Sequence, residues 1–352
     1  MATRKKKKKA KNGKAKRLLL LAAIVVVVIA AALVCANFRY VSTCMTRYKG
    51  AETTWLYIPE GSDREAIADS MRTTLGDDYG GLLANLWSGD TTKAPGAYRV
   101  EPGDHIWWLA RRISRGAQTP VKVSFNNVRT IDDLAERVCK RMSFSNKEFL
   151  DTLYSITREQ SIDIDTFPAM LLPDTYEAYW TESPRRLLKR FFKAHDRFWN
   201  SERRSKAAEL GLTPAQVATL ASIVEEETSN SKEHGTIARL YLNRLNRGMK
   251  LQADPTVKFA NGDFAARRIT GDMLKKDSPY NTYRVTGLPP GPIRIASAAA
   301  IDEVLNSEPN DYIYMCANPD FSGTHLFAKD YATHKRNAEA YHKALDSRGI
   351  KK

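Results

Sequence analysis

The sequence predicts an α+β protein with a single N-terminal transmembrane helix, then an α/β subdomain, then a larger mixed α+β domain. Three observations support this fold class. An unbroken apolar run occupies residues 18–38, short strand-like and helical segments alternate between residues 55 and 142, and longer helical patterns follow residue 184. With 43% hydrophobic and 27% charged residues, the chain of 352 residues can bury a globular core.

The positive charge of the chain is concentrated before the apolar run. The net charge is +15, but residues 1–17 contain ten basic and no acidic side chains, which leaves 45 basic against 40 acidic residues in the rest. Nucleic-acid binding takes its affinity from many phosphate contacts, so the nearly neutral remainder argues against that function. Lysine and arginine beside a membrane span instead set topology and bind anionic lipid.

The apolar run 18–38 reads LLLLAAIVVVVIAAALVCANF, and Asn37 is its only polar side chain. About 20 such residues cross a hydrocarbon core about 30 Å thick. The basic cluster before the run predicts a single-pass protein of the cell (inner) membrane with a cytoplasmic N-terminus and an extracytoplasmic remainder. A cleaved signal peptide is the alternative, but its apolar region has only about 7–15 residues.

Short strand–helix pairs follow the predicted span and its connector. Alternating apolar residues predict strands, and apolar residues at helical spacing behind a capping residue, Asp63 or Thr130, predict helices. The expected strands are 55–58, 96–100 and 121–125, and the expected helices are 64–71, 105–114 and 130–142.

Proline and polar clusters mark the later boundaries. Pro184 begins a long helix that runs to about Trp199, and the charged segment 201–206 introduces the next domain. The expected organisation is a basic cytoplasmic tail 1–17, the transmembrane helix 18–38, a linker 39–54, a subdomain with a connecting region 55–205, a main domain 206–345 and a C-terminal tail 346–352.

An acidic helix carries the strongest chemical signal. Thr213 and Pro214 predict its start, and a buried apolar stripe runs from Val217 to Thr228. On the helical wheel Glu226 lies opposite this stripe, in solvent, whereas Glu225 and Glu227 lie near its two edges. A carboxyl beside an apolar surface has a raised pKa and can donate a proton. The alternative is that all three glutamates form a solvated face.

The loops after this helix are rich in glycine, proline, asparagine and tyrosine. Such residues fix loop shapes and present flat aromatic and amide groups, which suit a polyhydroxylated ligand. Rigid surface turns are the alternative interpretation. The segments concerned are 248–257, 278–283 and 287–293.

These motifs together resemble the MltG/YceG-like family of bacterial endolytic murein transglycosylases. The order and spacing match as well as the residues. The resemblance implies that residues 55–205 contain a LysM-like subdomain and that 206–345 form the catalytic domain. The sequence departs from the family pattern at residues 124–128, where family members commonly have a Pro-Glu-Gly turn. The matching strings are ASIVEEET (221–228), NRL (243–245), GMKLQADPTV (248–257), SPYNTY (278–283) and GLPPGPI (287–293).

By motif position, the resemblance implies that Glu225 is the single catalytic acid and base. It would cleave the β-1,4 bond between N-acetylmuramic acid and N-acetylglucosamine in nascent peptidoglycan strands, as a carbon–oxygen lyase that leaves 1,6-anhydro ends and needs no cofactor or metal. Peptidoglycan synthases or division and elongation proteins are the expected partners. The expected substrate-binding residues are Glu227 (with Arg244 as its ion-pair partner), Asn243, Arg244, Gln252, Asp254, Thr256, Tyr280, Asn281 and Tyr283.

Several alternatives stay open at this stage. The chain could be a non-catalytic glycan-binding scaffold of the wall-synthesis machinery, or a hydrolase that uses Glu225 with Asp254 and leaves reducing ends. Asp254 could also be a structural residue at the turn before Pro255. Cys139 and Cys316 could be paired or free.

Overall fold

The computed structural model describes residues 2–266 and 268–348. The chain divides into two compact units, Met1–Pro120 and Val121–Lys352. The side chains of the predicted basic tail 1–17, and residues 349–352 of the predicted C-terminal tail, lie outside the described residues.

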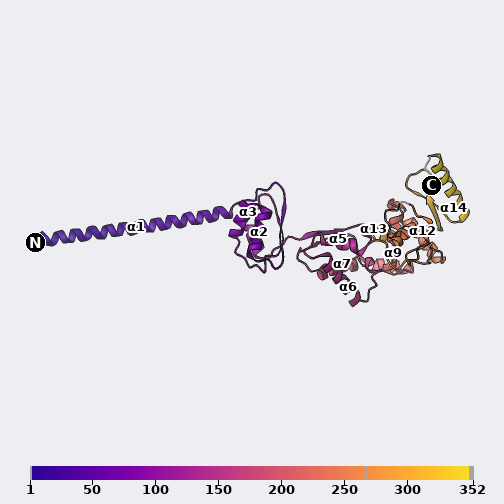
Figure 1. The fold of residues 1–352 in the computed structure, drawn as a ribbon, viewed down its shortest axis with the longest axis horizontal. Helices are drawn as coiled ribbons and strands as arrows, with labels where there is room; N and C mark the ends of the chain where they lie inside the picture. Colours follow the sequence, from indigo (N-terminus) through magenta and orange to yellow (C-terminus); the bar gives the residue numbers. More distant parts are fainter. Residues whose placement is uncertain (1, 267, 349–352) are drawn as a thin grey trace. The chain divides into compact units, whose positions relative to one another are not determined.

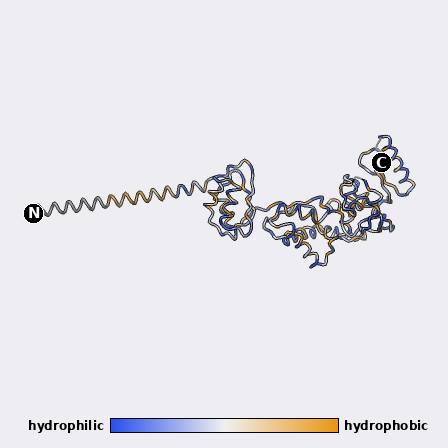
Figure 2. Tube along the Cα trace, in the orientation of Figure 1, coloured by the Kyte–Doolittle hydropathy of each residue, from blue (hydrophilic) through white to orange (hydrophobic). Residues whose placement is uncertain are grey.

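The first unit begins with one long helix, α1 (Ala2–Cys44). Within the described residues, its segment Leu19–Cys44 is the one helix that is both long and apolar enough to cross a membrane without a break. The apolar stretch is visible in Figure 2, and its side chains are exposed. This is the feature expected of a single-pass membrane anchor. The helix also extends six residues beyond the predicted end at Phe38.

The rest of the first unit is a two-stranded antiparallel sheet covered by three short helices. Leu56 of one strand lies opposite Tyr98 of the other, and both are fully buried. The predicted strands and helices are confirmed, and α3 is an addition that the apolar pattern did not indicate. The elements are β1 (Thr54–Ile58), α2 (Arg64–Leu75), α3 (Asp77–Leu86), β2 (Gly96–Val100) and α4 (Ile106–Ser114).

Part of the predicted linker 39–54 is held against the first unit. Backbone hydrogen bonds join Thr46 to Ile106 and Tyr48 to Asp104, both at 2.9 Å, and Arg47 forms an antiparallel bridge with His105. The end of α1 is therefore tied directly to the start of α4.

The second unit begins with a two-stranded sheet and its helices (Figure 1). Phe125 of β3, Tyr176 of β4 and Phe191 of α7 form one aromatic cluster, with ring centroids 4.5–5.6 Å apart. The elements are β3 (Val121–Phe125), α5 (Ile131–Cys139), α6 (Asn146–Glu159), the 3-10 helix η1 (Phe167–Met170), β4 (Asp174–Ala178) and α7 (Pro184–Phe198).

Helix α9 (Pro214–Glu227) is the centre of the second core. Thr213 and Gln216 form a capping box at its start, which confirms the predicted N-terminus. Every residue from Val217 to Val224 is buried, because helices pack around α9 on several sides. These neighbours are η1, α8 (Ser201–Glu209), α10 (His234–Asn246), α11 (Asp254–Asn261) and α13 (Ala298–Leu305).

The last elements form a hairpin and a covering helix. In β5 (Tyr314–Ala317) and β6 (His325–Ala328), Cys316 lies opposite Leu326. Helix α14 (Tyr331–Ser347) packs against β5 and β6 and has no buried residue, so one long face stays open. The remaining elements are η2 (Ser231–Glu233) and α12 (Gly271–Leu274).

Candidate active site

A polar cavity of about 220 Å³ opens beside the C-terminal end of α9. Segments far apart in the sequence build it: the ends of α9 and α10, the loop before α11, and the hairpin β5–β6. Its lining combines two carboxyls with aromatic, amide and guanidinium groups. The lining residues are Glu227, Leu240, Tyr241, Arg244, Leu251, Gln252, Asp254, Tyr283, Met315, Cys316, Ala317 and His325.

Glu227, the last residue of α9, carries the most perturbed carboxyl in this cavity. Burial, and to a smaller extent the nearby charge of Asp254, raise its pKa to about 7. The Tyr241 hydroxyl donates a hydrogen bond to Oε1 of Glu227 at 2.5 Å, which opposes the rise by stabilising the ionised form. A carboxyl with a pKa near neutrality can both donate and accept a proton at physiological pH.

Asp254 supplies the second carboxyl of the cavity. It is the first residue of α11, and its N-cap is Ala253, so the side chain is not used as the cap. The Tyr283 hydroxyl donates to Oδ1 of Asp254 at 2.7 Å. Burial, together with this bond, raises the pKa of Tyr283, which therefore stays protonated as a donor.

Arg244 holds the cavity walls together. Its Nε donates to the carbonyl of Ile313 at 2.6 Å, and its Nη1 donates to the carbonyl of Leu251 at 2.7 Å. These bonds link α10 to the segment before β5 and to the loop before α11. The predicted ion pair with Glu227 is absent among the described contacts, because the guanidinium donates to backbone carbonyls. Its charge still acts on Glu227 and lowers the pKa of that carboxyl.

Gln252 brings its side chain into the cavity through an unusual backbone conformation. Its φ of 51° lies in the left-handed region, which non-glycine residues seldom adopt. The backbone N–H of Gln252 donates to the carbonyl of Thr282 at 3.2 Å and fixes this geometry. Backbone strain of this kind concentrates at functional sites.

Glu225, the predicted acid, lies in a different environment. Its Oε2 accepts a hydrogen bond from the backbone N–H of Ser297 at 3.1 Å, at the start of α13, and lies 3.7 Å from Nε of Arg294. It does not line the Glu227 cavity. The carboxylate of Glu225 therefore takes part in an ion pair and in the start of α13, outside this cavity, and its assignment as the catalytic acid and base stays a prediction.

Glu226 is not the solvated residue that the helical wheel predicts. Arg129 donates to both of its oxygens, at 2.8 and 2.9 Å, and Arg294 donates to Oε1 at 2.9 Å. Its side chain is 18% exposed. The wheel places this residue wrongly because α9 is surrounded by other elements and has no solvent face over most of its length.

Two further predicted contact residues, Asn243 and Thr256, take part in hydrogen-bond networks away from the cavity lining. Asn243 donates from Nδ2 to the carbonyls of Asn310 and Tyr312, at 2.7 and 3.0 Å. The Thr256 hydroxyl, fully buried, lies 2.8 Å from the hydroxyl of Thr282. Both residues position the segments that carry cavity residues.

The residues of the SPYNTY loop (278–283) have different roles: Tyr280 and Asn281 are structural, whereas Tyr283 belongs to the cavity. Tyr280 is buried against Phe259, with ring centroids 4.6 Å apart. Asn281 is fully buried and donates from Nδ2 to the carbonyls of Leu274 and Lys276. Of this loop, only Tyr283 lines the cavity.

Sequence reasoning missed Tyr241, although a signal for it exists. Tyr241 and Arg244 are three residues apart on one helix and therefore share a face. His325, which matches a family position by motif but could equally be a packing residue, also lines the cavity, and its Nδ1 lies 2.9 Å from Oε2 of Glu233. Nothing in the sequence pairs the distant residues 233 and 325. Cys316 and Cys139 are both free thiols.

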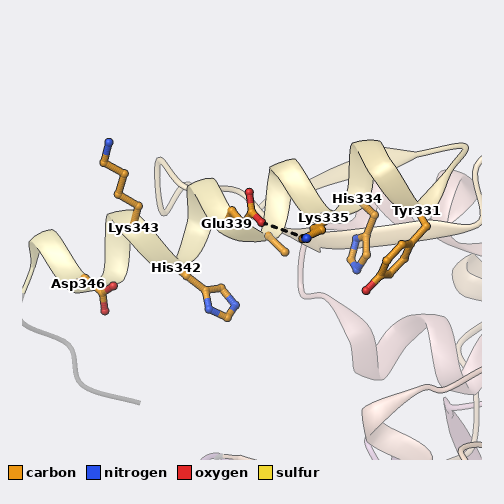
Figure 3. Close-up of a pocket in the computed structure, with 8 residues that line it drawn as sticks. Tyr331, His334, Lys335, Glu339, His342, Lys343 and Asp346 are labelled. Carbon is orange, nitrogen blue, oxygen red and sulfur yellow. Dashed lines mark ion pairs between the residues drawn. The ribbon is translucent and has the colours of Figure 1, made fainter.

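A larger groove, about 420 Å³, follows the open face of α14. Figure 3 shows Tyr331 and His334 side by side at one end and the ion pair of Lys335 with Glu339 along the helix. All of its lining side chains come from this one helix. It lacks a buried carboxyl, so the Glu227 cavity is the better candidate for acid–base chemistry.

A sequence model of the YceG-like family matches residues 56–340, which is most of the chain. The chain belongs to the YceG-like family. The chain has a YceG-like fold. It superposes on the crystal structure of a yceG-like protein from Listeria monocytogenes with a TM-score of 0.55 at 25% identity, and the match covers 82% of this chain and 99% of that one.

Two relatives carry the same name. The chain is 27% identical over 317 residues to an endolytic murein transglycosylase of Bacillus subtilis (strain 168), covering 83% of this chain and 86% of the relative. It is 31% identical over 174 residues to the protein of that name from Streptococcus pneumoniae (strain ATCC BAA-255 / R6), covering 47% of this chain and 31% of that relative.

Proposed function

We propose that this YceG-like protein is a membrane-anchored lytic transglycosylase of peptidoglycan in which Glu227 is the catalytic acid and base. The observation that carries the proposal is the Glu227 carboxyl, held at a pKa of about 7 in a polar cavity. The names of its curated relatives supply the substrate class.

The first step needs a proton donor. Protonated Glu227 gives its proton to the oxygen of the β-1,4 bond between N-acetylmuramic acid and N-acetylglucosamine. The bond from that oxygen to C1 of the muramic acid breaks, and the N-acetylglucosamine end leaves as an alcohol. A cation-like centre remains at C1, and Glu227 is now a carboxylate.

The second step needs a base. The Glu227 carboxylate takes the proton from the C6 hydroxyl of the same muramic acid, and O6 bonds to C1 to form the 1,6-anhydro ring. An internal hydroxyl held near C1 replaces the water that a glycosidase would activate, so a second catalytic carboxylate is not needed. Glu227 is protonated again, and the cycle closes.

The other cavity groups bind and orient the strand. Asp254, with its hydroxyl partner Tyr283, and the amide of Gln252 provide hydrogen bonds for sugar hydroxyl and acetamido groups. Arg244 fixes the walls and favours the carboxylate of Glu227 after proton transfer. A hydrolase that uses Asp254 for water is the second candidate, since both carboxyls line the cavity.

End-group analysis of the products tests the proposal. Purified full-length protein is incubated with glycan strands, and the released fragments are analysed by mass spectrometry. We expect 1,6-anhydro ends, and a loss of about 10²–10⁴ in rate for Glu227→Gln. Glu225→Gln tests the alternative assignment, because activity lost in that variant and kept in Glu227→Gln would place the catalytic role on Glu225. Reducing ends would favour the hydrolase, no release at all would favour a scaffold, and an active Glu227→Gln would refute the assignment.

Topology and cellular role complete the proposal. The N-terminus is cytoplasmic and the chain after α1 is extracytoplasmic, where cleavage of nascent strands would end their elongation near peptidoglycan synthases. A protease added outside spheroplasts should digest the part of the chain after α1 and leave a tag on residue 1 intact. Cleavage of the tag, with the part of the chain after α1 left intact, would indicate the opposite topology.

A further inference from the structure

The exposed face of α4 in the first unit has a distinctive composition. Trp107 and Trp108 are 38% and 48% exposed, and their rings pack edge to face with centroids 5.6 Å apart. Arg111 and Arg115 are exposed one turn and two turns further along. The helix contains no acidic residue, and its opposite face is buried in the core of the unit.

This face is tied to the end of the apolar helix α1. The backbone N–H of Ile106, the first residue of α4, donates to the carbonyl of Thr46 at 2.9 Å, two residues after α1 ends. The bridge between Arg47 and His105 extends the connection. These bonds hold the end of α1 directly against the start of α4, the helix that carries the two tryptophans.

The length of the apolar helix determines how far from the bilayer centre this connection lies. The apolar segment Leu19–Cys44 has 26 residues and is about 39 Å long. The hydrocarbon core of a bilayer is about 30 Å thick, and the head-group layers add about 5–8 Å on each side. The excess of about 9 Å brings the end of α1, and the start of α4, to the head-group layer, and any tilt of the helix lowers them further.

We propose that the Trp107, Trp108, Arg111 and Arg115 face of α4 rests on the bilayer surface. Indole rings, apolar with one polar N–H, favour the membrane interface. Arginine side chains there reach anionic phosphate head groups. The proposal rests on α1 being a membrane anchor and is independent of the assignment of Glu227. Its consequence is that the first unit lies on the membrane and is not suspended from a flexible linker.

Quenching of tryptophan fluorescence by brominated lipids tests this contact. The full-length protein is reconstituted into phosphatidylcholine vesicles whose acyl chains carry bromine, with and without phosphatidylglycerol. None of the six tryptophans lies in α1, so quenching reports on the chain after α1. We expect quenching in the wild type, stronger for bromine near the head groups than for bromine near the bilayer centre.

Matched tryptophan variants identify which residues are quenched by the lipid. Trp107→Phe with Trp108→Phe should lose most of the quenching, whereas Trp55→Phe, on β1 of the same unit, should keep it. Flotation of every variant with the vesicles separates failure of the anchor from failure of the contact. Equal quenching in the wild type and the double variant, or none in floating wild type, would overturn the proposal and indicate a protein or glycan partner for this face.

The arginines have their own measurement. Phosphatidylglycerol should increase the quenching of the wild type, and Arg111→Gln with Arg115→Gln should remove that increase. An increase that persists in the arginine variant would refute their assignment to anionic head groups.

Discussion

The Tyr241 hydroxyl donates a 2.5 Å hydrogen bond to Oε1 of Glu227, which joins α10 to the end of α9 inside the cavity. The bond stabilises the ionised carboxyl, while burial favours the neutral acid and dominates. The opposition of these two effects leaves the pKa of Glu227 at about 7. The proposed proton donor is thus regulated by a residue on a different helix.

Replacement of Tyr241 should move the pH dependence of activity. Tyr241→Phe removes the bond that lowers the pKa of Glu227, so this pKa rises. Because the first step needs protonated Glu227, the fall in kcat on the alkaline side should shift to higher pH. A hydrogen bond to a charged group is worth about 1.5–3 kcal/mol, which corresponds to about one to two pH units. Rates from pH 5 to 9 measure it.

Tyr280→Phe is the control for this prediction. Tyr280 is also a buried tyrosine, but it lies outside the cavity lining and its hydroxyl interacts with Asp165. Its removal should leave the alkaline limb in place. If Tyr241→Phe and Tyr280→Phe had the same pH–rate profile, Glu227 would not determine the alkaline limb.

Folding stability should also depend on the protonation of Glu227. The native pKa of about 7 is above the ordinary value of 4.5. The stabilisation is therefore complete below about pH 4.5 and is lost as the pH rises to about 7, since the unfolded chain releases its proton first. The total loss is about 3 kcal/mol. Urea unfolding of the wild type and Glu227→Gln between pH 4 and 8 gives the difference, and parallel curves would contradict it.

The sequence was informative where local rules decide the structure. Capping and proline placed the start of α9 at Pro214, and alternation placed the strands of the first unit. Composition and length also indicated the apolar helix. These features depend on neighbours within a few residues, and the structure confirms them.

The three glutamates of α9 show where the sequence was insufficient. A helical wheel assumes one buried face, but α9 contacts elements on several sides, so adjacent residues meet different partners. Glu225 meets the start of α13, Glu226 meets two arginines, and Glu227 meets Tyr241. Arg129 lies 97 residues from Glu226, and no local pattern predicts such a pair.

The Arg129–Glu226 contact should contribute measurably to stability. The side chains of Arg129 and Glu226 are 29% and 18% exposed, so the pair is poorly screened. Glu226→Ala also removes the partner of Arg294, and we expect a loss of about 1–3 kcal/mol in the free energy of unfolding. A double-mutant cycle with Arg129→Ala should give a coupling energy of at least about 0.5 kcal/mol.

The Glu136–Lys140 pair on α5 is the matched comparison. Both side chains are at least 60% exposed, and they are four residues apart on one helix. Such pairs contribute about 0.3–0.5 kcal/mol. A coupling at Arg129–Glu226 that is no larger than this value would refute a structural role for the buried pair.

Gly291, in the GLPPGPI loop, is expected to be intolerant of any side chain. A Cβ atom at this position would overlap the backbone carbonyl of Asp165. The loop must then move, and with it Ile293, whose N–H donates to the buried Ser222 hydroxyl of α9 at 3.0 Å. Gly291→Ala should therefore lower the free energy of unfolding by about 1–3 kcal/mol and reduce activity through displacement of α9.

Gly271 offers the opposite case in the same unit. It begins α12, has no atom within 4 Å of the added Cβ and lacks a positive φ. Alanine is the better helix former, so Gly271→Ala should be neutral or stabilising by up to about 1 kcal/mol. Urea denaturation of the two variants compares the signs directly. If Gly291→Ala were as stable as Gly271→Ala, the loop would not pack against Asp165, and the link from this loop to α9 would lose its basis.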